Sequence, residues 1–192
     1  LTGGPMKIAP SNLFSFALIL TWVSSNGLTS SGQGSSGIGK ARTAAEYRQV
    51  AMAHDGDALR GARLFADEQR LACSKCHSVD GRGAKAGPDL FAIGDQFARR
   101  DLIDAVLMPS ASIAVGYSTT MVETKSGEEH QGVLKQVTDS GAELMGADGQ
   151  RVRIAISDIQ EQRGSSVSLM PEGLQAGLSL PEFTDLIEYL VT

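Results

Sequence analysis

The only two cysteines of this 192-residue chain, Cys73 and Cys76, stand three residues apart and are followed directly by His77. A C-x-x-C-H sequence places two thiols one helical turn apart, so both can form thioether bonds to a haem while the adjacent imidazole binds the iron. Few short segments constrain a fold more, because the rest of the chain must then enclose a large flat ring. The sequence therefore predicts one covalently attached haem c, held by Cys73 and Cys76, with His77 on the iron.

Three other interpretations of the segment fit the sequence less well. A thioredoxin-like redox pair needs a strand-to-helix junction, whereas a predicted helix precedes Cys73 and a glycine-rich loop follows His77. A zinc site needs more soft ligands, and only His54 and His130 remain, in unrelated positions. A disulfide closing so short a loop stabilises little and leaves His77 without a role.

The first part of the chain has the layout of a secretory signal. Lys7 precedes an apolar stretch over 13–23, which is followed by small polar residues over 24–27. The stretch is shorter than the roughly 20 residues that cross a bilayer, so we expect no stable membrane insertion after cleavage. We expect a signal peptide with its upstream residues over 1–27, a flexible Ser/Gly-rich leader over 28–40, and the folded domain over 41–192.

Local patterns predict four helices outside the cysteine segment. Helix-favouring composition covers 41–53, and Asp57 is a candidate N-cap for a helix running to about Asp67. A short helix is expected to start at Asp101 and to stop at Pro109. The sequence Ser-Leu-Pro-Glu from 179 forms a capping box, and apolar residues then repeat at helical spacing to about 190.

The pattern changes between 117 and 163. Short β-branched or alternating segments are separated by turn-forming pairs at about ten-residue spacing, which is typical of an antiparallel meander or a small barrel. The expected strands are 118–124, 132–137, 142–145 and 151–156. These residues are predicted to form a small β module.

Five segments together resemble the class I cytochrome c family, and in particular bacterial haem-binding domains that carry a β insertion between the haem motif and the axial methionine. They are GDALRGARLF, CSKCH, GPDL, SLMPEGL and EFTDLIEYL. The resemblance implies a mainly α cytochrome c fold, with about four or five helices around the haem and the first helix packed across the last. The β module at 117–163 would be the insertion.

The resemblance also implies roles for single residues. Cys73 and Cys76 would be the thioether anchors and His77 the proximal ligand. Pro88 would accept a hydrogen bond from the imidazole, which fixes the ring and raises its basicity. Met170 would be the distal ligand.

Two of these roles have alternatives. Pro88 also fits a residue that only rigidifies its loop. A methionine is more often core filler than a ligand, but Met170 is expected in an irregular loop, where Pro171 prevents helix continuation, whereas Met121 and Met145 lie on predicted strands and Met108 ends a helix. His130 or an open site are the alternatives for the sixth position.

Composition narrows the function. The chain has 17 basic and 22 acidic residues, a net charge of −5, which disfavours nucleic acid as a partner. No catalytic triad, phosphate loop or pair of carboxylates stands out, so an electron carrier is predicted rather than an enzyme. The prediction is a periplasmic or otherwise secreted one-electron carrier that makes transient contacts with redox partner proteins, a dehydrogenase or an oxidase. The alternatives are a haem-based ligand-binding or sensor domain with an open or labile distal site, and an electron-accepting docking module for a dehydrogenase.

Overall fold

The computed structural model describes residues 41–83 and 85–192, so the predicted signal peptide (1–27) and leader (28–40) lie outside the described residues. In these ranges no helix is long and apolar enough to cross a membrane. The helices are α1 (Ala44–Ala53), α2 (Ala58–Ala66), α3 (Cys73–Cys76), α4 (Arg99–Leu107) and α5 (Leu180–Val191), with short 3-10 helices η1 (Ile93–Asp95), η2 (Ile156–Asp158) and η3 (Leu174–Gly177). The strands are β1 (Thr119–Thr124), β2 (Glu129–Val137), β3 (Gly141–Met145), β4 (Arg151–Ala155) and β5 (Ile159–Ser165).

Side-chain caps define where three of the helices begin. Thr43 caps α1 in a capping box, Asp57 caps α2 by accepting from the backbone N–H of Arg60, and Ser179 caps α5 in the capping box expected from the sequence. The helix predicted from Asp101 begins two residues earlier, at Arg99. No side chain caps α4, so local sequence gave no signal for its true start.

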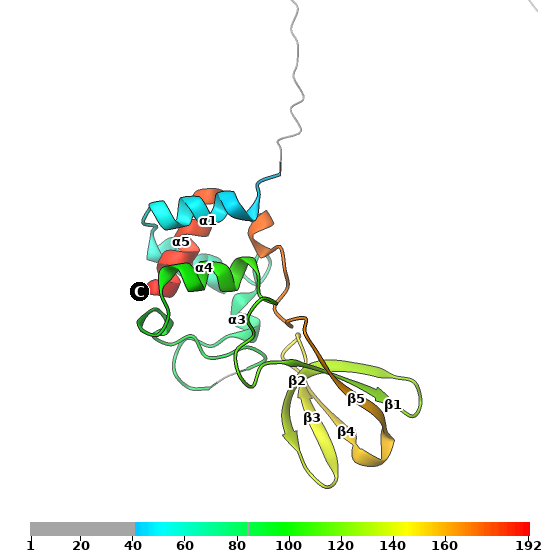
Figure 1. The fold of residues 1–192 in the computed structure, drawn as a ribbon. Coiled ribbons are helices and arrows are strands. Elements are labelled where there is room, and N and C mark those ends of the chain that lie inside the picture. Colours follow the sequence, from blue (N-terminus) through cyan, green and yellow to red (C-terminus); the bar gives the residue numbers. More distant parts are fainter. Residues whose placement is uncertain (1–40, 84) are drawn as a thin grey trace, which may run out of the picture. The chain divides into compact units, whose positions relative to one another are not determined.

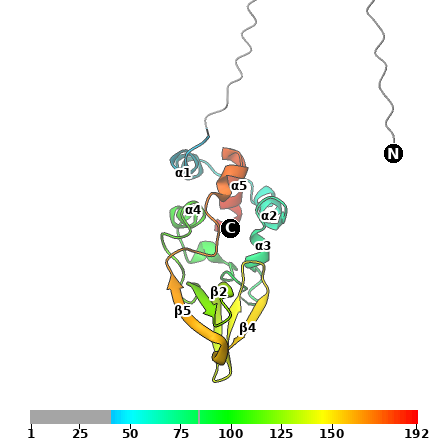
Figure 2. The same cartoon turned by 90° about the vertical axis from the view of Figure 1, so that its right-hand side faces the viewer.

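Helix α5 is the centre of the helical core. Figures 1 and 2 show α5 lying between α1, α2 and α4, and it contacts each of them. The core is formed by apolar side chains of these four helices and of the segments between them, among them Tyr47, Phe65, Ile103, Phe183 and Ile187. Both helices that precede the cysteines thus pack on the last helix.

A close approach of backbones joins α2 to α5. Gly61 lies against Asp185 and Tyr189, where an added Cβ would lie 2.7 Å from the Tyr189 Cβ. The Arg60 guanidinium donates two hydrogen bonds to the Asp185 carboxylate, from Nε at 2.7 Å and from Nη2 at 2.9 Å. Because the Asp185 side chain is 5% exposed, this charged pair fixes the two helices in one relative position.

Residues 119–165 form a five-stranded antiparallel sheet in the order β4-β3-β2-β1-β5. The first four strands are the predicted meander, although β2 begins at Glu129 rather than at 132. The prediction omitted β5, which pairs antiparallel with β1. In the described sheet β4 and β5 are the two edges, so it is an open sheet rather than a closed barrel.

The expectation of a mainly α fold is therefore right only in part. The helices form one core, and the sheet has a second, smaller core of Val122, Leu144 and Ile154. In sequence the whole sheet lies between α4 and η3, as the predicted β module does. That it is an insertion relative to the family stays a prediction.

Candidate functional site

A sharp turn delivers the chain from α2 to the cysteines. The carbonyl of Asp67 accepts hydrogen bonds from the N–H groups of Leu71 and Ala72. Ala72 then takes a left-handed conformation, with φ of 54°, which is uncommon for a residue other than glycine. The turn leads into α3, a single helical turn from Cys73 to Cys76, and His77 closes it by donating its N–H to the Cys73 carbonyl at 2.9 Å.

The ring of His77 is held by Pro88. Nδ1 of His77 lies 2.9 Å from the carbonyl oxygen of Pro88. A carbonyl can only accept, so Nδ1 carries the proton and Nε2 has a free lone pair, as an iron ligand requires. Burial lowers the pKa of His77, although the Pro88 bond acts in the opposite direction. The lowered pKa favours the neutral ring, which is the form that binds metal. The position expected for Pro88 is the one observed.

Gly87 gives the ring a second support that the sequence analysis did not single out. Its N–H donates to the Cys76 carbonyl at 2.8 Å, which ties the loop back to α3. An added Cβ on Gly87 would lie 2.7 Å from Nδ1 and 2.8 Å from Nε2 of His77, inside contact distance. Only glycine lets the backbone come so close to the imidazole. The sequence signal that could have pointed to this support is the position of Gly87 directly before Pro88.

The two thiols are free and half-buried. Burial raises the pKa of Cys73 to about 11 and also raises that of Cys76. A thiol–disulfide redox pair depends on a lowered thiol pKa, so these thiols are not set up for that chemistry. In the described part of the chain, no group of three or more His, Cys, Asp or Glu side chains is arranged to hold a metal ion.

Comparison with known families agrees with this geometry. Residues 58–139, from the start of α2 to just past β2, match the family model for cytochrome c. This match identifies residues 58–139 as part of a cytochrome c domain. A search of curated proteins found no match.

A cytochrome c domain binds haem c covalently and carries electrons. The residues present fit that cofactor, since two unpaired thiols lie at the two ends of one helical turn and the next residue is an oriented, neutral imidazole. The match ends before Met170, whose role as a ligand stays a prediction.

Met170 lies in the irregular segment between β5 and η3 of the cytochrome c domain. Its N–H donates to Ser168 Oγ at 3.1 Å, and the Ser168 N–H donates to Ser110 Oγ at 3.2 Å. The Met170 side chain packs against the same helical core as Cys73 and Leu90. These contacts anchor the loop on the domain that carries the haem motif.

His130, the alternative to Met170, lies in the sheet. It is part of β2, paired with Val122 of β1, and its Nε2 lies 3.4 Å from a carboxylate oxygen of Glu128. Its side chain is 19% exposed, so His130 is largely covered.

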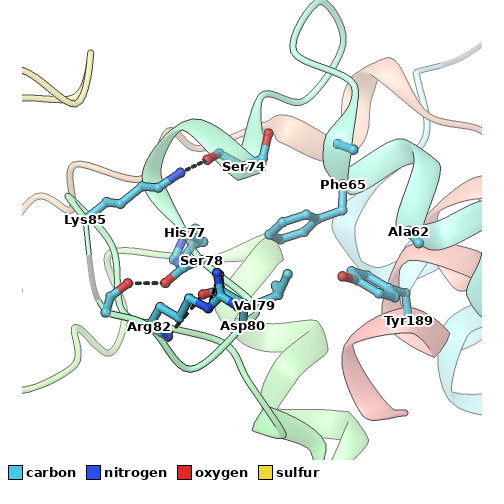
Figure 3. Close-up of a pocket in the computed structure, with 12 residues that line it drawn as sticks. Ala62, Phe65, Ser74, His77, Ser78, Val79, Asp80, Arg82, Lys85 and Tyr189 are labelled. Atoms are coloured by element: carbon cyan, nitrogen blue, oxygen red, sulfur yellow. Dashed lines mark hydrogen bonds and ion pairs between the residues drawn. The ribbon is translucent and has the colours of Figure 1, made fainter.

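A cavity of about 490 Å³ lies beside His77 (Figure 3). One wall is formed by α2 and α5, where the rings of Phe65 and Tyr189 pack with centroids 5.5 Å apart. The opposite wall comes from the segment between Ser74 and Lys85. Met170 does not line this cavity. The cavity is therefore not by itself the space between the predicted ligands His77 and Met170.

Proposed function

We propose that this chain is a secreted carrier of single electrons, not an enzyme, whose haem iron is bound by His77 and Met170. The observation that carries the proposal is the bond from His77 Nδ1 to the Pro88 carbonyl. It fixes the ring and leaves Nε2 as the free nitrogen. The haem, when bound, supplies an iron that changes oxidation state by one electron. A ligand whose orientation is fixed keeps reorganisation between the two states small.

Met170 is proposed as the sixth ligand. Hydrogen bonds through Ser168 hold its backbone, and its side chain packs against the same core as Cys73. A thioether ligand favours ferrous iron and raises the reduction potential, which suits electron transfer better than ligand binding. Occupation of both axial positions would exclude the open-site form of the sensor alternative, and a Met170 that is not displaced by added ligands would exclude the labile form.

Secretion and the partners belong to the same proposal. The signal-like layout of residues 1–27 supports export, and haem attachment to a C-x-x-C-H segment is compatible with it. The partners would be a dehydrogenase or an oxidase that docks transiently and exchanges one electron. Expressed from the full sequence, the protein should appear in the periplasmic or secreted fraction with a mature start near residue 28. A full-length protein retained in the cytoplasm would contradict this part of the proposal.

The absorption spectrum of the oxidised holoprotein tests the ligands. Sulfur bound to ferric haem gives a weak charge-transfer band at long wavelength. We expect the band in the wild-type protein and in Met108→Ala, a control at an exposed methionine at the end of α4, and its loss in Met170→Ala. An oxidised wild-type spectrum that lacks the band and shifts on adding imidazole, together with a reduced spectrum that shifts on adding carbon monoxide, would favour the open-site alternative.

Covalent attachment has its own test. After denaturation and extraction with acidified organic solvent, the haem should stay with the wild-type polypeptide. In the Cys73→Ala, Cys76→Ala double variant no haem should remain attached. Retention of attached haem in the double variant would contradict the roles given to these two cysteines.

A further inference from the structure

The turn between β3 and β4 reaches the haem-attachment helix. The carbonyl oxygen of Ala147 lies 3.5 Å from Sγ of Cys76, a contact between residues 71 positions apart. Gly149 of the same turn also lies near α3, since a Cβ added to it would lie 3.6 Å from the carbonyl oxygen of Lys75. Two contacts therefore place this turn at the carboxyl end of α3, next to one of the two predicted thioether sulfurs.

The turn has a defined shape. The Gly146 N–H donates to the Gln150 carbonyl at 2.9 Å, and the Gly149 N–H donates to the Gly146 carbonyl at 3.0 Å. Gly149 has φ of 76°, a conformation that suits glycine. Oδ1 of Asp148 accepts from the Gln150 N–H at 2.9 Å, so the carboxylate is held by its own turn.

Charges of both signs surround Cys76. Asp148 directly follows Ala147, whose carbonyl oxygen contacts the sulfur, so this acidic residue belongs to the turn that reaches Cys76. Lys75 directly precedes Cys76 in α3, and Nζ of Lys85 donates to the Ser74 carbonyl at 2.7 Å. An acidic residue of the β3–β4 turn and two basic residues of α3 and the following loop are thus the charged groups nearest in the chain to these contacts.

We propose that the turn 146–150 covers the haem edge bonded to Cys76 and that Asp148 sets a negative charge there, which makes the sheet a specificity element for electron donors and acceptors. In a thioether the sulfur would be bonded to the carbon that joins the macrocycle, so a group packed on the sulfur would lie beside the haem edge. Once the thioether forms, the sulfur has no hydrogen to donate, so the contact with Ala147 continues as packing alone. The inference rests on the proposed attachment at Cys76.

The turn would act in two ways. Its atoms keep solvent and large reagents from the edge at Cys76. Its charge repels anionic redox partners and attracts cationic ones, an effect that weakens with ionic strength. The sheet would then select partners by charge at the site of electron exchange.

Reduction of the ferric holoprotein by two small reagents tests the charge. Dithionite is anionic, and hexaammineruthenium(II) is cationic. We expect Asp148→Asn to speed the first and slow the second, each by roughly twofold, so the ratio of the two rate constants rises about fourfold at low salt. The ratio cancels any common effect of a changed potential. The matched control is Asp139→Asn, in the β2–β3 turn at the opposite end of the meander, which should leave the ratio unchanged.

A second variant tests the cover. Deletion of Ala147 and Asp148 should raise both rate constants above those of Asp148→Asn, whereas deletion of Asp139 and Ser140 should not. Unchanged rates in both turn variants, with haem still attached, would overturn this inference and leave the proposed function standing. A wild-type protein without attached haem would overturn both.

Discussion

Replacing Gly87 by alanine isolates the support of the proximal histidine. The backbone of Gly87 does not have positive φ, so alanine is acceptable there apart from its contact with the ring. The new Cβ would lie 2.7 Å from Nδ1 of His77, whereas ordinary contact begins at 3.4 Å. Because Cε1 of the ring lies closer still, the ring or the loop must move by at least about 0.7 Å.

That movement is enough to break the bond to Pro88. The distance from Nδ1 to the Pro88 carbonyl is 2.9 Å, and a movement of about 0.7 Å along this bond would stretch it to about 3.6 Å, too long for a hydrogen bond. Loss of such a partner typically weakens metal binding by about 10- to 100-fold. A less basic imidazole loses more of its affinity for ferric than for ferrous iron. If the difference is tenfold, the reduction potential rises by about 59 mV.

The assay is a spectroelectrochemical titration of holoprotein with its covalent haem content measured in parallel. Gly177→Ala is the matched control, because no atom lies within 4 Å of a Cβ added there and its φ is not positive. We expect the control to keep the wild-type potential. A Gly87→Ala protein with full haem content and an unchanged potential would refute the argument that Gly87 and Pro88 together hold the ring.

Three further predictions concern the fold. Gly61→Ala would press a Cβ onto the carbonyl of Asp185. The cost of overpacking exceeds the gain in helix propensity, so the free energy of unfolding in urea titrations should fall by about 2 kcal/mol. An unchanged midpoint would mean that α2 and α5 separate freely. Tyr47→Phe removes the 2.6 Å bond to the Leu178 carbonyl and should cost about 1–3 kcal/mol by the same assay, whereas a neutral result would mean that water replaces the hydroxyl. The hydrogen bond from Arg70, together with the bonds from the capping Ser179, lowers the pKa of Glu182 from 4.5 to about 2. The stabilisation from this carboxylate is therefore complete above pH 4.5 and is lost as the pH falls toward 2. The urea midpoint should drop less between pH 6 and pH 3 in Glu182→Gln than in the wild type.

Local chemistry allowed much of the site and fold to be predicted. The capping residues Asp57 and Ser179 were identified because a cap acts on backbone groups only two or three residues away. The bond from His77 to Pro88 was expected from the family resemblance, and the structure places it there. In each case the partners lie close together in the sequence.

Features that depend on distant partners could not be predicted. Strand β5 has a polar, largely exposed sequence without alternation, and it is a strand because β1 supplies its hydrogen bonds. Helix α4 starts at Arg99, whose side chain bonds to the carbonyls of Ala51 and His54. The contact of Ala147 with Cys76 depends on how the sheet meets α3, which no local pattern encodes.

The central place of α5 has a consequence for how the protein matures. The Tyr47 hydroxyl donates a hydrogen bond to the Leu178 carbonyl, 131 positions later in the sequence. The helical core therefore closes only after the whole sheet segment has been synthesised. Until then Cys73 is in an open chain, with a thiol of ordinary acidity, whereas burial in the finished core raises its pKa to about 11. The reactive form of the thiol is thus more abundant before folding than after it. We therefore expect haem attachment to be easier on the unfolded segment, so that the domain would close around a cofactor already bonded to it.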